Sequence, residues 1–228
     1  MNLTEFITKY KDIGSVAFST HETKYNSYNM GKYVSDNNIP GDIIECGVAA
    51  GSNFAFLMLG SKASTNQTNR TCWGFDSFEG IQLAGKKDTE QPGLGKITHN
   101  VNVPDDDLLK SSGVTSIDKQ TVIQNLTKWN LYDNVQLVEG WIQKTLTEEL
   151  IKQIPSIAIL RLDMDIYAPT KYALEKLFPL VSPGGVVIID DWGLQGARSA
   201  CNEYFDSIGF VPNYIKVPNS DPVYFIKP

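Results

Sequence analysis

Short runs rich in β-branched and aromatic residues alternate along this chain with longer segments whose apolar residues recur at helical spacing. This alternation is typical of an α/β fold, in which helices cover both faces of a mostly parallel sheet. Ligands of such folds bind beyond the carboxyl ends of the strands, so the residues that end each strand are the first candidates for function. The expected strands are residues 42–46, 71–76, 135–138, 157–162 and 186–189, followed by a hairpin formed by 210–217 and 223–226.

The organisation of the chain indicates one domain with two additions. A length of 228 residues fits a single large domain. Residues 1–40 form an N-terminal helical segment ahead of the first expected strand, whereas residues 80–113 show no sustained period and contain several glycines and prolines. A loop of that length is usually a functional lid or a passive insertion. Because it follows the strand that ends in Asp76, we expect a lid over the site, with a passive insertion as the alternative.

Composition argues against several classes of protein. Acidic residues outnumber basic ones by 26 to 20, the net charge is -6, and no Lys- or Arg-rich block is present, which disfavours a nucleic-acid partner. No run approaches the ~18 apolar residues of a membrane span, and the first residues do not read as a signal peptide. Cys46, Cys72 and Cys201 are too scattered to indicate a zinc site or a disulfide framework. We therefore expect a cytoplasmic protein without nucleic-acid or membrane partners, and a homo-oligomer is left open.

A glycine-rich turn follows the first expected strand, where Gly47 and Gly51 precede a helical segment. Glycine allows a tight turn and close approach of a ligand to the backbone. The N-terminus of the helix offers unpaired amides to an anionic group. Because the spacing lacks the middle glycine of the dinucleotide fingerprint, it favours a single carboxylate over a pyrophosphate, with an ordinary strand-to-helix turn as the alternative.

Asp76 ends the second expected strand. A carboxylate at that position can accept hydrogen bonds from both hydroxyls of a ribose. An aspartate that caps a helix or is merely solvated is the alternative. Together with the glycine turn, Asp76 indicates a ligand that contains a nucleoside.

Three aspartates follow two strongly apolar strands: Asp163 comes directly after residues 157–162, and Asp190 and Asp191 follow residues 186–189. If these strands are neighbours, their ends lie about 5 Å apart and the three carboxylates converge. Carboxylates so close repel one another unless a cation neutralises them. A ligand set made only of oxygen suits a hard divalent ion such as Mg²⁺, or else Mn²⁺ or Ca²⁺. The sequence therefore predicts a metal site.

Asp165 shares a strand face with Asp163 and Arg161. An ion pair with Arg161 and a direct role as metal ligand are both open for Asp165. The predicted metal set is therefore limited to Asp163, Asp190 and Asp191.

Several segments together carry a resemblance to a known family: residues 40–48, 76–80, 139–141 with 145–146, 160–167, and 180–193 with 196–198. On these segments the chain resembles the macrocin O-methyltransferase family of the TylF/MycF type, whose members methylate sugar hydroxyls on macrolides and related natural products. The resemblance implies a Rossmann-like class I methyltransferase fold with seven strands, the last of them antiparallel. It also implies S-adenosylmethionine on the Gly47 side of the sheet and a metal ion held by the three aspartates.

The resemblance extends to further contacts with S-adenosylmethionine. Glu45 is expected to reach the amino group of its methionine portion or to support the glycine loop. Glu139 and Trp141 are placed to meet the edge and the face of the adenine, although a core position is equally open for Trp141. The complete expected cofactor set is Glu45, Gly47, Gly51, Ser52, Asp76, Ser77, Glu139, Gly140 and Trp141.

The chain departs from the family pattern beside the expected acceptor site. Met164 stands where a glycine is usual, Trp192 stands where a tyrosine is common, and residues 50–52 replace an Arg-Gly-Gly-like run. The acceptor is therefore expected to be a small, sugar-containing molecule whose identity the sequence leaves open.

The expected reaction transfers a methyl group to a metal-bound hydroxyl. Asp163 is the preferred base, because it can contact both the metal and the acceptor, and His99 and His21 are weaker candidates. A methyltransferase for catechols or other phenols would share the fold and the metal chemistry. A nicotinamide-dependent oxidoreductase would not explain the aspartate cluster, and a binding module would hold the ligands without transferring the methyl group.

Overall fold

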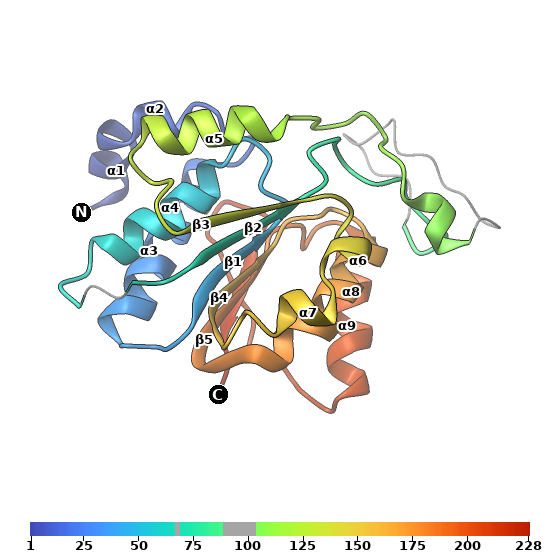
Figure 1. Cartoon of the computed structure of the whole chain (residues 1–228). Helices are drawn as coiled ribbons and strands as arrows, with labels where there is room; N and C mark the ends of the chain where they lie inside the picture. Colours follow the sequence, from blue (N-terminus) through green and yellow to red (C-terminus); the bar gives the residue numbers. More distant parts are fainter. Residues whose placement is uncertain (67–68, 89–103) are drawn as a thin grey trace.

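The computed structural model describes residues 1–66, 69–88 and 104–228, and a seven-stranded sheet lies at its centre (Figure 1). The strand order is β3-β2-β1-β4-β5-β7-β6. The first five strands are parallel, whereas β7 is antiparallel to both of its neighbours, which confirms the predicted sheet with its antiparallel last strand. The strands are β1 (Asp42–Cys46), β2 (Cys72–Asp76), β3 (Val135–Glu139), β4 (Ile157–Leu162), β5 (Val181–Ile189), β6 (Ile215–Lys216) and β7 (Val223–Ile226).

The strand bounds agree with the apolar runs except toward the C-terminus. β5 begins at Val181, ahead of the turn that the sequence predicts at residues 182–185. A register shift against β4 lets the strand pass through that segment and resume pairing beyond it. β6 comprises Ile215–Lys216 alone, so most of the run 210–217 is not strand.

Helices cover both faces of the sheet (Figure 1). Neighbouring residues of β1 point to opposite faces: Ile43 packs in the same cluster as Phe54, and Ile44 in the same cluster as Leu174 and Phe205. One layer contains α1 (Leu3–Lys9), α2 (Lys11–Gly14), α3 (His21–Asp36), α4 (Ser52–Lys62) and α5 (Lys119–Lys128), and the other contains α6 (Ile142–Thr145), α7 (Glu148–Ile151), α8 (Tyr167–Leu177) and α9 (Gln195–Ser207).

Two glycines allow α3 and α4 to pack backbone against backbone. A Cβ atom at Gly31 would lie 2.1 Å from the carbonyl oxygen of Leu57, and one at Gly60 would lie 1.9 Å from that of Tyr28. Since real Cβ atoms do not approach backbone oxygens so closely, larger residues at either position would push the helices apart. The crossing fixes the N-terminal helices against α4, whose first turn borders the site.

The described arms of the long insertion pair with each other. Ile81 N donates to the Val114 oxygen and Leu83 N to the Lys110 oxygen, both at 2.9 Å, and Gln82 forms a β-bridge with Ser111. We call residues 80–83 and 110–114 the stalk. The sequence predicted no regular structure here, because the partners are separated by a long stretch. Residues 89–103, and with them His99, lie outside the described part of the chain.

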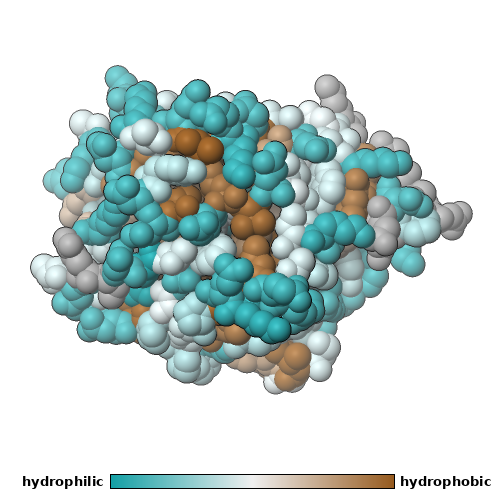
Figure 2. Space-filling model, viewed as in Figure 1, coloured by the Kyte–Doolittle hydropathy of each residue, from teal (hydrophilic) through white to brown (hydrophobic). Residues whose placement is uncertain are grey.

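The surface turned toward the viewer in Figure 2 is largely hydrophilic, and its apolar side chains gather in separate groups. Within the described ranges, no helix combines the length and the apolar character needed to span a membrane.

Candidate functional site

A cleft opens at the carboxyl ends of β1 to β5, where the topology of the fold predicts it. Two of the predicted site residues, Gly51 and Glu139, are not among its lining residues. The predicted residues that do line it are Glu45, Gly47, Ser52, Asp76, Ser77, Gly140, Trp141, Asp163, Asp190 and Asp191.

The glycine turn after β1 packs tightly against the end of β4. Gly47 has a φ of 87°, and a Cβ atom there would lie 1.7 Å from the backbone oxygen of Asp163. Any larger side chain is therefore excluded on both conformational and steric grounds. Gly51 also has a positive φ, of 85°, and forms the N-cap of α4. Its backbone conformation completes the turn that leads into α4.

Asp76 holds this turn in place. Its Oδ2 accepts hydrogen bonds from the backbone amides of Val48 and Ala49 at 2.7 and 3.0 Å, and its Oδ1 accepts one from Phe78 N at 2.7 Å. A carboxylate has about four acceptor positions, so one remains for a ligand. Burial raises the pKa of Asp76, although the three amides oppose the shift. The sequence did not predict this structural role.

Two other residues that were expected to contact the cofactor, Ser52 and Glu139, interact with other side chains or backbone groups of the protein. Ser52 is buried, and its hydroxyl donates to the backbone oxygen of Ile13 at 2.8 Å, which ties α4 to α2. The Glu139 carboxylate lies 3.5 Å from the Lys119 ammonium, and its side chain is 58% exposed. Glu139 is thus paired with Lys119 and is not among the lining residues of the cleft.

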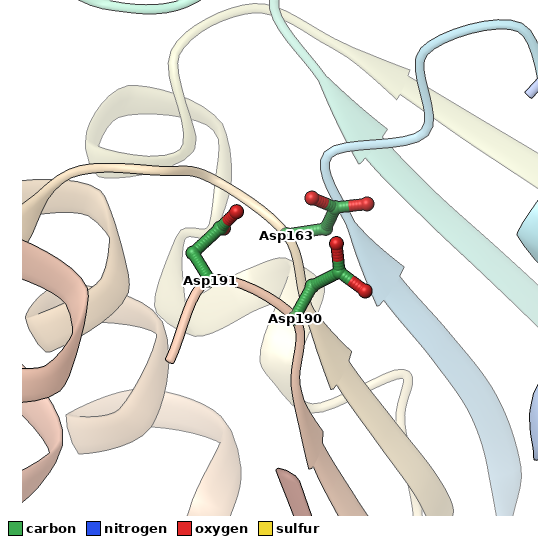
Figure 3. Close-up of side chains that lie close together, drawn as sticks. All are labelled: Asp163, Asp190 and Asp191. Atoms are coloured by element: carbon green, nitrogen blue, oxygen red, sulfur yellow. The ribbon is translucent and has the colours of Figure 1, made fainter. Parts of the chain in front are cut away.

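Asp163, Asp190 and Asp191 converge as the sequence predicts (Figure 3). Asp163 follows β4, and the other two follow its neighbour β5. One carboxylate oxygen of each residue lies within 4.8 Å of the others. The three side chains come from two adjacent strand ends and face a common volume.

Arg161 lies buried beneath the three aspartates and binds two of them. Its guanidinium donates to Asp163 Oδ2 at 2.6 Å, to Asp190 Oδ1 at 2.5 Å and to Glu45 Oε1 at 2.5 Å. In the described structure the alternative ion pair with Asp165 is not formed. The Asp165 backbone amide instead donates to Asp191 Oδ2 at 2.8 Å.

The site carries more negative charge than Arg161 balances. Burial raises the pKa of Glu45 to about 8, with the Arg161 charge opposing the shift and the Asp163 charge adding to it. Burial likewise raises the pKa of Asp190 to about 7 and that of Asp191 well above its ordinary value, again with neighbouring carboxylates adding to the shift. Such a cluster takes up protons unless a cation is present.

The donor set fits a divalent cation. Each of the three carboxylates has one oxygen engaged by Arg161 or by a backbone amide, which leaves the other oxygen for an ion. Two oxygens bound to one Mg²⁺ lie at most about 4.2 Å apart, and Ca²⁺ allows about 5 Å. The three carboxylate oxygens lie within 4.8 Å of one another, so modest side-chain movements would bring them onto one divalent cation.

The fold adds lining residues that the sequence did not single out. Residues 16–19, between α2 and α3, line the cleft, as do Gln82 of the stalk and Gln143 of α6. No motif marks these residues, because only the tertiary structure brings their segments to the strand ends. His21, by contrast, is exposed and is not a lining residue.

Comparison with known proteins gives consistent matches. The family model described as "Macrocin-O-methyltransferase (TylF)" matches residues 24–227. The chain is 34% identical over 169 residues to the 8-demethyl-8-(2,3-dimethoxy-alpha-L-rhamnosyl)-tetracenomycin-C 4'-O-methyltransferase of Streptomyces olivaceus, a match that covers 74% of the chain and 59% of that relative. It is 31% identical over 194 residues to the demethyldecarbamoylnovobiocin O-methyltransferase of Streptomyces niveus, covering 84% of the chain and 68% of that relative.

Among solved structures, the O-methyltransferase NovP superimposes with a TM-score of 0.70 at 27% identity, covering 91% of this chain and 80% of that one. The fold and the sequence thus match the same class of proteins. The chain spans only 59% of the length of the Streptomyces olivaceus relative.

Proposed function

Because the chain belongs to the macrocin O-methyltransferase (TylF) family, we propose that it transfers a methyl group from S-adenosylmethionine to a hydroxyl of a small, sugar-containing acceptor, with a divalent cation at the aspartate cluster. The observation that carries the proposal is a single cleft that joins the glycine turn, Asp76 and the three converging aspartates. The glycine turn with Asp76 forms the cofactor half of the cleft, and the three aspartates form the metal half. Neither half alone would distinguish this function from the functions of other proteins with similar folds.

The cofactor half of the cleft has groups that complement S-adenosylmethionine. Glu45 Oε2 is buried without a hydrogen-bond partner among the described residues, and it is a suitable acceptor for the ammonium of the methionine portion. The remaining acceptor position of Asp76 suits a ribose hydroxyl. Bound here, the sulfonium supplies an activated methyl group.

In the metal half of the cleft, Asp163, Asp190 and Asp191 would hold the divalent cation. Bound there, the ion would act as a Lewis acid toward an acceptor hydroxyl, lowering the pKa of that hydroxyl. Asp163 lies between the two halves, since its backbone contacts Gly47 and its carboxylate belongs to the cluster. We therefore propose Asp163 as the base, held in orientation by Arg161.

The acceptor class follows from the relatives. The name of the Streptomyces olivaceus relative specifies methylation of a rhamnosyl-bearing compound, so we propose a rhamnoside or related glycoside here. A catechol or other phenol is the second candidate, because the same metal chemistry would activate it. The three cysteines are free and buried, which suits a reducing compartment and a cytoplasmic enzyme.

Two measurements test this function. Calorimetry should show binding of S-adenosylmethionine or its demethylated product, and tight binding of a nicotinamide nucleotide in its place would overturn the cofactor assignment. Mass spectrometry with labelled cofactor, Mg²⁺ and a panel of glycosides and catechols should then show label on a glycoside. Label found on catechols alone would replace the proposed acceptor class.

A further inference from the structure

Two glutamine side chains meet inside the cleft. Gln143 Nε2 donates to Gln82 Oε1 at 2.7 Å, and Gln82 is only 4% exposed. In the part of the chain that the structure describes, Gln82 Nε2 and Gln143 Oε1 are buried and have no hydrogen-bond partner. Buried polar groups in native proteins are nearly always paired, so one unused donor beside one unused acceptor calls for a ligand.

We propose that Gln82 and Gln143 together recognise the adenine edge of the cofactor, an inference that rests on the proposed function. Adenine presents an acceptor, N1, beside a donor, the exocyclic amino group. Gln82 Nε2 donates to N1, and Gln143 Oε1 accepts from the amino group. The two unsatisfied amide atoms thereby become paired.

The placement of the two residues agrees with this assignment. Gln82 follows β2, which ends in Asp76, and Gln143 follows β3. These strands are neighbours, so a nucleoside whose ribose binds Asp76 can extend its base toward the loops that carry both glutamines. Trp141 and Ile142 also line this part of the cleft. Glu139, the residue that the sequence suggested for the adenine edge, faces Lys119 instead.

Because a side-chain amide can be turned to exchange its donor and its acceptor, only some ligands can test this proposal. If both amides rotated by 180°, the pair would offer an acceptor and a donor in reversed order and could accommodate hypoxanthine. A deaminated cofactor is therefore a poor probe. A ligand in which N1 is replaced by C–H cannot be matched by either arrangement.

The experiment compares S-adenosylhomocysteine with its 1-deaza analogue by calorimetry. The wild-type protein should bind the analogue about tenfold more weakly, because Gln82 Nε2 loses its acceptor. Gln82→Met should bind S-adenosylhomocysteine about tenfold more weakly and should no longer distinguish the two ligands. Gln120→Met, at an exposed position on α5, is the matched control and should behave as the wild type.

Equal binding of both ligands by the wild type, or full discrimination retained in Gln82→Met, would overturn the adenine assignment alone. Absence of S-adenosylhomocysteine binding by the wild type would overturn the proposed function as well.

Discussion

Arg161 balances part of the charge of the site. Its guanidinium is fully buried and joins Glu45 of β1, Asp163 after β4 and Asp190 after β5. A buried ion pair stabilises a protein only when the partners are held in good geometry, because desolvation opposes it. Here three strands share one guanidinium, so the carboxylates are already positioned before any cation binds.

The metal proposal makes a prediction at Asp190. Replacement by Asn preserves the size of the side chain and an oxygen for Arg161, but it removes one negative charge from the ligand set. Mn²⁺ or Mg²⁺ affinity should fall by about tenfold or more, because ligand charge tunes the affinity of such sites over orders of magnitude. Calorimetric titration with the metal ion measures this affinity. S-adenosylhomocysteine affinity should change little, and unchanged metal affinity would exclude Asp190 from the ligand set.

Asp76 should matter for cofactor binding through two effects. Asp76→Ala removes the acceptor proposed for the ribose and releases the amides of Val48 and Ala49. Loss of such charged hydrogen bonds should weaken S-adenosylhomocysteine binding by about 1–3 kcal/mol. Asp133→Ala, at an exposed position, is the control. Wild-type affinity in Asp76→Ala would remove this residue from the cofactor site.

At the scale of secondary-structure elements, the crossing of α3 and α4 sets the position of the first turn of α4. Alanine favours a helix by roughly 1 kcal/mol over glycine, yet a Cβ atom at Gly31 would meet the Leu57 oxygen at 2.1 Å. The steric conflict should dominate, so Gly31→Ala should destabilise the protein by about 1–3 kcal/mol. Urea denaturation measures this change in the free energy of unfolding. Gly14→Ala, with no neighbouring atom nearer than 3.8 Å, should be tolerated, and equal stability of the two variants would contradict the packing argument.

The stalk links the long insertion to the cleft, because Gly80, Ile81 and Gln82 are lining residues. If the insertion closes over bound ligands, the backbone amides of Ile81, Leu83 and Ser112, which bond across the stalk, should exchange more slowly with solvent when S-adenosylhomocysteine is present. Hydrogen exchange measured by mass spectrometry tests this. Identical exchange with and without the ligand would leave the insertion a passive one.

At the scale of the whole molecule, the alternation of apolar runs was enough to predict the parallel sheet. The convergence of Asp163 with Asp190 and Asp191 also followed, because β4 and β5 are neighbours in the observed order. What could not be predicted depends on side-chain direction and on distant partners. Glu139 lies at a strand end, yet its side chain faces Lys119.

Contacts between remote segments also could not be predicted from the sequence. The Ser52 hydroxyl donates to the backbone oxygen of Ile13, and the hydrogen bond between Gln82 and Gln143 joins the stalk to α6. No local sequence pattern predicts such contacts, because each partner is an ordinary residue type within its own segment. The positions of the strand ends could therefore be predicted from the sequence, whereas contacts between remote segments could not.

The most direct test of metal-dependent methyl transfer is to measure the transfer on one preparation in excess EDTA and in excess Mg²⁺, with an acceptor identified by the glycoside panel. Transfer should be abolished in EDTA and restored by Mg²⁺, because the acceptor hydroxyl would be activated only with a cation at the aspartate cluster. Asp163→Asn should remain slow even at saturating Mg²⁺, since the proposed base is lost. Full transfer in EDTA would rule out metal dependence and would mean that Asp163, Asp190 and Asp191 serve another purpose.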